Sequence, residues 1–166
     1  MGELYAEALV KRKDTLGTIA IRFLLIFGTV ACFFLTALSS YMIIVVAILV
    51  VLIVYFYPKL SIEYEYVFCD GQLDFDKIMG NSKRKNVMRI DLDQVQIVAI
   101  EGSNALDAYK NRTNLKVKNF TSLKPDIKPY IIITQTNEDT VKIIFEPSEK
   151  MIECMKQKAP RKVFTY

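Results

Sequence analysis

The chain has 166 residues, of which 52% are hydrophobic, and its 22 lysines and arginines against 18 aspartates and glutamates give a formal net charge of +4. It contains no histidine, which excludes histidine general bases, Ser-His-Asp or Cys-His catalytic groups and the common zinc sites. The charge is too balanced for a dedicated nucleic-acid binder, and no stacking motif accompanies the cations.

The first fifteen residues, MGELYAEALVKRKDT, mix apolar and charged side chains. Leu4, Ala8 and Leu9 would share one side of a helix, with the charges elsewhere. This pattern predicts a short interfacial segment over residues 1–15, helical where it leads into a bilayer.

A long uncharged stretch follows, from residue 23 to residue 57. One straight helix of this length would measure about 52 Å at about 1.5 Å per residue, which exceeds a hydrocarbon core of about 30 Å. We therefore predict a transmembrane helical hairpin over residues 16–58, with a turn at LSSY that contains Ser39 and Ser40. One long, tilted or kinked span is the alternative. A cleaved signal peptide would have an apolar region of only about 7 to 15 residues.

Basic residues near the ends of the spans predict the orientation. Lys11, Arg12, Lys13 and Arg22 lie around the start of the first helix and Lys59 follows the second, whereas the LSSY turn carries no cation. The positive-inside rule then predicts a multi-pass protein of the cell membrane with both termini in the cytoplasm.

After residue 58 the apolar pattern changes to a period of two. SIEYEYVFC alternates Tyr64, Tyr66 and Phe68 with glutamates, as in a half-buried strand, and Asp70-Gly71 predicts a tight hairpin turn. LDFDKIM is the next predicted strand, and NVMRIDL is predicted to return after a turn at Gly80-Asn81-Ser82.

Two aspartates alternate with apolar residues on the second of these strands. Register decides whether Asp74 and Asp76 meet Lys85 or Arg89 across the hairpin, and such pairs contribute about 0.2 to 1 kcal/mol. Two carboxylates on an open face would remain solvated, and they would lack the cleft that acid-base catalysis needs. They would also lack the further oxygen ligands that a metal ion needs.

The three cysteines are scattered, without metal-ligand spacing. We predict no catalytic, cofactor or metal site.

The rest of the chain predicts further strands and a closing helix. QVQIVAI is a buried strand, and SNALDAYKN is a short helix with Ser103 as its cap and Leu106 and Tyr109 facing inward. A basic loop with one irregular edge strand precedes a hairpin of YIIITQT and TVKIIFE, which turns at residues 137–139.

The segment EPSEKMIECMKQKAPRK predicts a closing helix, in which Pro147 suits the first helical turn and Pro160 ends the helix. The apolar stripe predicted to pack on the sheet comprises Met151, Ile152, Met155 and Ala159.

Hairpins followed by one C-terminal helix are the architecture of pleckstrin-homology (PH)-like domains. The segments YEYVFCDGQLDFDKI, SKRK, GSNALDAY, IIFEPSEKM and APRKVF resemble a family of small bacterial two-helix membrane proteins of unassigned function. The resemblance covers most of the chain after residue 58. It implies an α+β membrane protein with an N-terminal transmembrane helical hairpin and, over residues 59–166, a PH-like cytoplasmic antiparallel β barrel or sandwich with a C-terminal helix.

The cations around one hairpin tip are the candidate contact for anionic lipid headgroups or for a partner: Lys83, Arg84, Lys85 and Arg89. In PH domains an early hairpin often supplies basic residues for phosphate recognition, and each charge near an anionic surface is worth up to about 1 kcal/mol. The alternative is a solvated tip whose lysines keep strand edges from pairing.

Three functional hypotheses follow. The one we favour is a non-enzymatic, membrane-anchored module for interaction or scaffolding at the cytoplasmic membrane surface, which binds another protein. The second is a domain that binds anionic lipid through the basic tip. The third, an unrecognised enzyme, would need an ordered pocket with a perturbed Asp or Lys.

Overall fold

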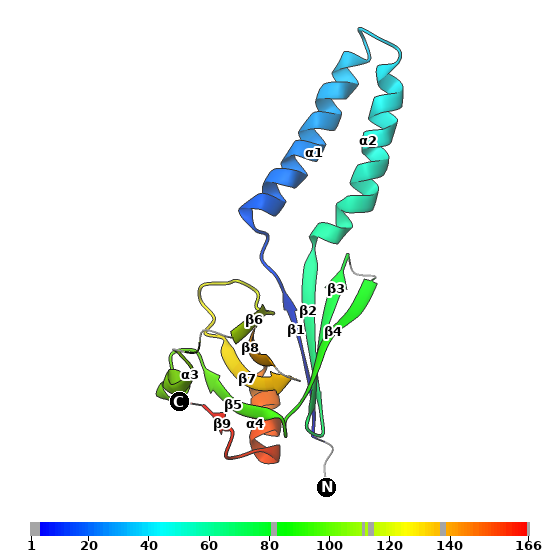
Figure 1. Ribbon diagram of the computed structural model, residues 1–166. Helices are drawn as coiled ribbons and strands as arrows, with labels where there is room; N and C mark the ends of the chain where they lie inside the picture. The colour runs from blue at the N-terminus through cyan, green and yellow to red at the C-terminus, as the bar shows by residue number, and fades with distance from the viewer. Residues whose placement is uncertain (1–3, 81–82, 111, 113–114, 137–138, 166) are drawn as a thin grey trace. The chain divides into compact units, whose positions relative to one another are not determined.

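The computed structural model describes residues 4–80, 83–110, 112, 115–136 and 139–165 (Figure 1). The chain divides into two compact units. The β unit comprises Met1–Arg12, Glu63–Lys77 and Arg84–Tyr166, and the helical unit comprises Lys13–Ile62 and Ile78–Lys83. The β unit therefore contains chain from both sides of the two long helices, and the described residues 4–15 are divided between the two units.

The helical unit contains α1 (Leu16–Leu35), α2 (Met42–Phe56) and the short 3-10 helix η1 (Pro58–Leu60). Thr15 caps α1, its hydroxyl accepting a hydrogen bond from the amide of Thr18 at 3.4 Å. A non-helical connection that includes Ser39 and Ser40 separates α1 from α2. The predicted helical hairpin is confirmed, and the alternative of one long helix is wrong.

Both long helices are predominantly apolar, and Arg22 of α1 is the one charged residue in them. The spans Leu16–Leu35 and Met42–Leu60 have mean hydropathies of 2.2 and 2.6 and are long and apolar enough to cross a membrane. Neither α1 nor α2 has a buried residue. Near one end of the pair, Arg22 forms an ion pair with Asp14 and lies over the ring of Tyr57, 5.2 Å from its centroid.

The first segment of the chain is a strand, so the predicted interfacial helix is wrong. Strand β1 (Tyr5–Lys11) pairs antiparallel with β2 (Ile62–Cys69), with Tyr5 opposite Cys69 and Lys11 opposite Glu63. An isolated helix this short is not stable in water, whereas pairing satisfies the free backbone groups along the edge of β2. Ala6 is only 1% exposed, so β1 also contributes to the core.

The first sheet has the strand order β1-β2-β3-β4. The two-residue turn Asp70-Gly71, with φ angles of 44° and 103°, joins β2 to β3 (Gln72–Met79), as predicted. Strand β4 (Lys83–Asp91) follows. Asn81 and Ser82 of the predicted second turn lie outside the described residues.

The second sheet has the order β6-β8-β7-β5-β9. The predicted strands are present as β5 (Val95–Ile100), the edge strand β6 (Leu115–Asn119), β7 (Tyr130–Thr136) and β8 (Asp139–Phe145). The last strand, β9 (Val163–Phe164), was not predicted. The pairs β6–β8 and β5–β9 are parallel, so this sheet is not purely antiparallel. Of the predicted turn at residues 137–139, the first two lie outside the described residues.

Two helical segments complete the β unit. The 3-10 helix η2 (Asn104–Leu106) continues into α3 (Asp107–Lys110), and Ser103 caps it as predicted, accepting a hydrogen bond from the amide of Ala105 at 3.3 Å. Helix α4 (Glu149–Lys158) begins after the cap Ser148, so Pro147 lies outside the first turn in which it was predicted.

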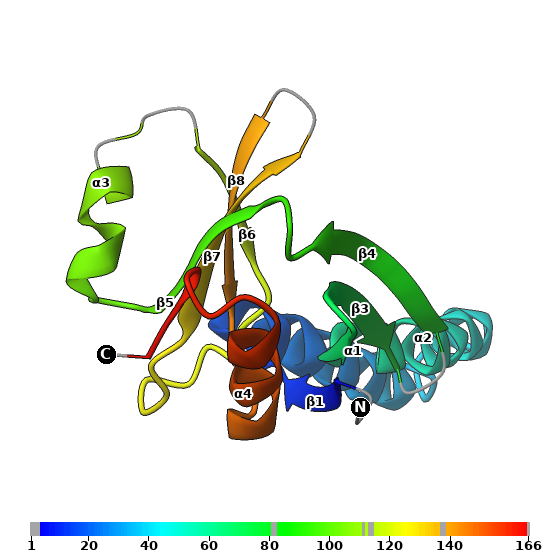
Figure 2. The same ribbon diagram turned by 90° about the horizontal axis from the view of Figure 1, so that it is seen from below.

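Helix α4 buries its apolar stripe within the β unit. Met151, Ile152 and Met155 are buried as predicted, together with Cys154, while Ala159 is half-buried. The helix packs against β1 and β9 (Figure 2).

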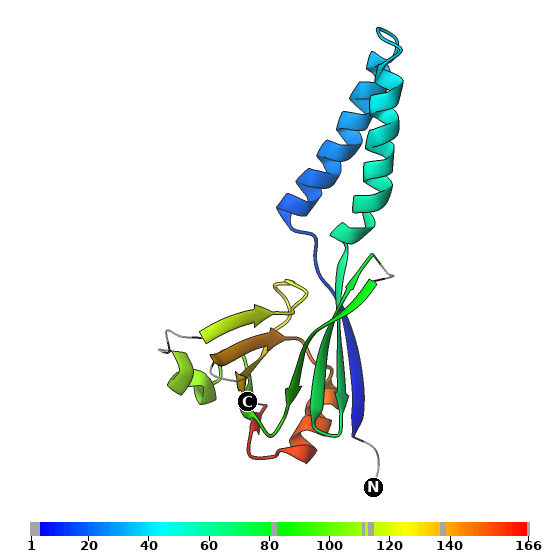
Figure 3. The same cartoon turned by 45° about the vertical axis from the view of Figure 1, so that its right-hand side comes forward.

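An aromatic cluster joins the two sheets, whose strands run across one another (Figure 3). The ring of Phe75 stacks on that of Phe120 at 4.8 Å and meets those of Tyr66 and Phe145 edge-on at 5.6 and 5.7 Å. These rings come from both sheets and from the chain after β6. The prediction of an α+β fold is confirmed.

Candidate functional site

Both arginines of the predicted basic tip are bound by carboxylates of the first sheet. The guanidinium of Arg89 makes two hydrogen bonds with Asp74, Nε to Oδ1 at 2.6 Å and Nη2 to Oδ2 at 2.9 Å. Arg84 donates through Nε to Asp76 at 2.6 Å, and its Nη2 lies 2.8 Å from Glu65. The hydrogen bonds to Asp76 and Asp74 raise the pKa of Arg84 and Arg89 respectively.

Asp76 is buried, with 7% of its surface exposed, and this corrects the prediction of a solvated carboxylate. Its second oxygen accepts a hydrogen bond from Asn86 at 2.8 Å. The predicted pairing of the aspartates with β4 is confirmed for Asp74 and Arg89, but Asp76 pairs with Arg84. Arg84, Asn86 and Arg89 all reach aspartates of β3, although positions 86 and 89 would lie on opposite faces of a strand with strict alternation.

The two lysines of the tip differ from the arginines. Lys83 and Lys85 are exposed, and no carboxylate of the described residues lies within 4.0 Å of either ammonium group. Of the four candidate residues, the structure therefore leaves these two available for an external anion.

Within the helical unit, the end of β3 is held against the chain that follows α2. The amide of Gly80 donates to the carbonyl of Ser61 at 3.2 Å. Gly80 has a φ of +62°, and a Cβ atom there would lie 2.9 Å from Cβ of Pro58 and 3.0 Å from its carbonyl oxygen. Only glycine fits this approach without strain. Beside it, the ammonium of Lys59 lies 3.1 Å from the ring centroid of Tyr55.

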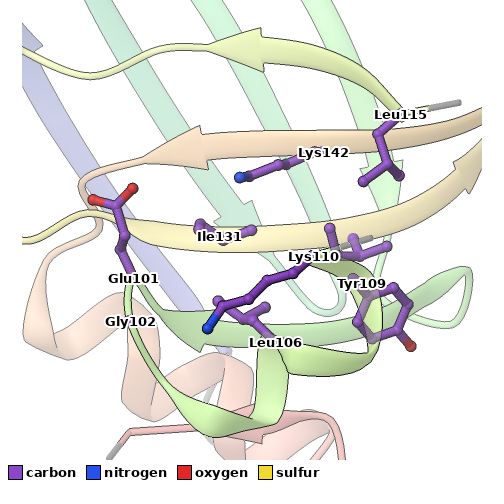
Figure 4. Close-up of a pocket in the computed structure, with 9 residues that line it drawn as sticks. Glu101, Gly102, Leu106, Tyr109, Lys110, Leu115, Ile131 and Lys142 are labelled. Atoms are coloured by element: carbon purple, nitrogen blue, oxygen red, sulfur yellow. The ribbon is translucent and has the colours of Figure 1, made fainter. Parts of the chain in front are cut away.

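A pocket of about 280 Å³ lies on the outer face of the second sheet, under the η2–α3 segment (Figure 4). Its wall is mainly apolar, from Leu106, Tyr109, Leu115, Ile131 and Ile133. Charged side chains from three segments also line it, and these are Glu101, Lys110 and Lys142.

Sequence reasoning predicted that Leu106 and Tyr109 face inward but missed this pocket. The available signal was Lys142, the one charged residue in the middle of the β-branched run TVKIIFE. Its pairing partners in the register are Val117 of β6 and Ile133 of β7, so an ammonium group is placed on an otherwise apolar face.

A second, more open pocket of about 330 Å³ lies beside the same sheet and contains Glu146, which is 9% exposed. The Glu146 carboxylate accepts hydrogen bonds from the amide and the hydroxyl of Ser122 at 3.0 and 2.9 Å. These contacts give Glu146 a structural role, because they fix the irregular chain after β6. In the described part of the chain, no three or more Cys, Asp or Glu side chains form a group suited to a metal ion.

Comparison with known proteins identifies the family. A family model described as Bacterial PH-like domain (DUF6106) matches residues 2–165, a range that includes β1, both long helices and both sheets. No curated protein and no solved structure gives a significant match. The resemblance inferred from the sequence is confirmed, and the chain belongs to the bacterial PH-like domain family DUF6106.

Proposed function

We propose that the protein is a non-enzymatic interaction module, anchored in the cell membrane by α1 and α2 with both termini in the cytoplasm. The observation that carries the proposal is the exposed apolar surface of the helices, for example Phe34 at 72% and Val54 at 71% exposed. Apolar surface of this extent is unstable in water. A hydrocarbon core about 30 Å thick matches the 20 residues of α1, about 30 Å long.

Chain connectivity supports the same proposal. The strand before α1 and the strand after α2 are hydrogen-bonded neighbours, with Lys11 opposite Glu63. The β unit is therefore connected to the helical unit at two nearby points of the chain, after β1 and before β2. Membership of a PH-like family supports a role in interaction or lipid binding.

A protein partner is favoured by the edge of the second sheet. Strand β6 ends the sheet, and Val117 on it is 60% exposed. An exposed edge strand can accept a strand from another chain, which gives main-chain hydrogen bonds and pockets for alternate side chains.

Site-specific photocrosslinking in cells tests this proposal. A photoreactive amino acid would replace Val117 in the full-length protein at native expression, and a matched control would replace Lys156, which is exposed on α4. We expect one discrete adduct at position 117 that is absent at position 156. Crosslinking to no protein at position 117, or equally at both positions, would contradict a partner at this edge.

A second candidate function, contact with anionic headgroups, is supported by the attachment of Gly80 to Pro58 and Ser61. If α2 spans the bilayer, η1 lies where the chain leaves it, and the same unit contains the hairpin end up to Lys83. The proposed contact is made by Lys83 and Lys85, since the carboxylates already bind Arg84 and Arg89.

Native mass spectrometry of the full-length protein tests the lipid contact. After exchange into micelles with equal phosphatidylglycerol and phosphatidylethanolamine, we expect retained phosphatidylglycerol that is lost in the double variant Lys83→Gln, Lys85→Gln. The matched control, Lys150→Gln with Lys156→Gln, removes two exposed cations of α4. Equal retention by both double variants would mean that the tip has no headgroup site.

A further inference from the structure

We propose that the pocket beneath η2 and α3 is a binding site for a small amphipathic monoanion, an apolar or aromatic group carrying one carboxylate or similar acidic group. It is separate from the basic tip and from the edge of β6, so the proposal does not depend on either proposed contact. At about 280 Å³ the pocket is near the lower limit of ligand sites, which suits a molecule of roughly ten to fifteen heavy atoms.

The pocket has a polar and an apolar end. In Figure 4 the nitrogen ends of Lys110 and Lys142 point toward the side on which Glu101 lies, whereas Tyr109 and Leu115 lie at the opposite side. The ammonium group of Lys110 is paired with Asp107 at 2.6 Å, so the cation of this end that has no carboxylate partner among the described residues is Lys142. Its ammonium group can bind an acidic group on a ligand.

Lys142 is the residue that selects the acidic group. It is half-buried, it projects from β8 next to Ile133 of β7, and no carboxylate within the described ranges approaches its ammonium group within 4.0 Å. Lys110 already has a partner in Asp107 at 2.6 Å. A bound carboxylate would provide the Lys142 ammonium group with a charge-assisted hydrogen bond.

The apolar end is formed by side chains that the sheet holds in place. Ile131 and Ile133 are buried on β7 at 4% and 1% exposure, and Leu106 of η2 is 6% exposed. These residues belong to a small core that is packed by Tyr109 from α3. Because rigid elements carry this wall, the pocket is preformed, which limits the entropy lost on binding.

Binding of 3-phenylpropionate and its neutral amide to the full-length protein in neutral nanodiscs tests the proposal. The readout is the methyl NMR signals of Ile131 and Ile133, which respond to the pocket and not to ligand dissolved in the lipid. We expect the acid to saturate these shifts with a dissociation constant below about 1 mM and the amide to bind about tenfold more weakly.

Three variants separate the site from nonspecific binding. Lys142→Met keeps the stem of the side chain and removes the charge, and it should weaken binding of the acid about tenfold without affecting the amide. Leu115→Trp should fill the pocket and abolish binding of both, while Lys156→Met on α4 should change neither. Equal affinity for acid and amide, unchanged binding in Leu115→Trp, or no saturable shift with either probe would overturn the proposal.

Discussion

The Tyr66 hydroxyl is buried in the aromatic cluster and donates a hydrogen bond to the carbonyl of Phe120 at 2.5 Å. Burial raises the pKa of Tyr66 above the ordinary value of 10.0. Above pH 10 the unfolded chain releases this proton while the folded chain keeps it. The stability that Tyr66 contributes is therefore complete below pH 10 and is lost as the pH rises toward its folded pKa.

We expect the free energy of unfolding of the β unit to fall above pH 10, and to fall less steeply in Tyr66→Phe. Near pH 7 that variant should be less stable by about 1 kcal/mol, since the carbonyl of Phe120 loses its donor. Denaturant unfolding of the full-length protein in micelles, followed by near-UV circular dichroism from pH 8 to 11.5, measures both effects. If the free energy of unfolding fell equally steeply with pH in the parent and in Tyr66→Phe, folding would not protect Tyr66 from ionisation.

Asp76 is the second residue with a testable role, because it accepts hydrogen bonds from Arg84 and Asn86 while nearly buried. Asp76→Ala should lower the free energy of unfolding by about 2 kcal/mol, the usual cost of losing hydrogen bonds to a charged group. The control Asp126→Ala, at an exposed loop position, should stay within about 0.5 kcal/mol of the parent. Similar losses in the two variants would contradict the structural role of Asp76.

Residue pairing was predictable only where strand alternation is regular. Asp74 and Arg89 were predicted as neighbours because both follow the period of two. The partners of Asp76 could not be predicted, since the side chains of β4 that reach the aspartates, Arg84, Asn86 and Arg89, do not share one strict alternation. The sequence therefore offered four candidate cations at the tip, and the carboxylates of the sheet bind two of them, Arg84 and Arg89.

At the scale of elements, strands with regular alternation and clear turns were predicted, whereas β1 and β9 were not. Both lie at the ends of the chain and are stabilised by partners that are distant in sequence, β1 by β2 and β9 by β5. Local periodicity contains no information about such pairing, because a seven-residue segment with mixed apolar and polar positions fits either a helix or an edge strand.

Strand β1 leads to a prediction about fragments. A fragment of residues 61–166 lacks β1, so it leaves the edge of β2 unpaired and removes a strand on which α4 packs. We expect this fragment to aggregate, whereas the same fragment preceded by residues 4–12 on a short glycine-serine linker should be monomeric in size-exclusion chromatography. A soluble, folded fragment without β1 would contradict the assignment of residues 5–11 to the β unit.

The end of the β3–β4 hairpin yields another element-level prediction. Gly80→Ala should destabilise the protein more than Gly102→Ala, although both glycines have positive φ angles, because a Cβ at position 80 meets Pro58 and one at position 102 meets nothing within 4 Å. Holding an alanine at a positive φ angle costs about 1 to 2 kcal/mol by itself at either position. Thermal unfolding of both variants measures the difference, and equal losses would mean that Gly80 is not closely packed on η1.

For the whole molecule, composition and hydropathy predicted two helices followed by a small β domain with a C-terminal helix, and this order is correct after residue 16. What the sequence could not predict is that the domain begins before the helices. The pocket on the second sheet also escaped prediction, because its wall combines η2, α3 and three strands that only the folded chain brings together.

The central claim is that α1 and α2 cross the membrane as a hairpin and keep the β domain in the cytoplasm. The most direct test is cysteine labelling in intact cells with a membrane-impermeant maleimide. One full-length variant would carry Ser39→Cys as its single cysteine, and the other would retain only Cys69, which is exposed on β2. Our account predicts that position 39 is labelled from outside and that Cys69 is labelled only after permeabilisation. Labelling of Cys69 from outside, or of both positions only after permeabilisation, would contradict it.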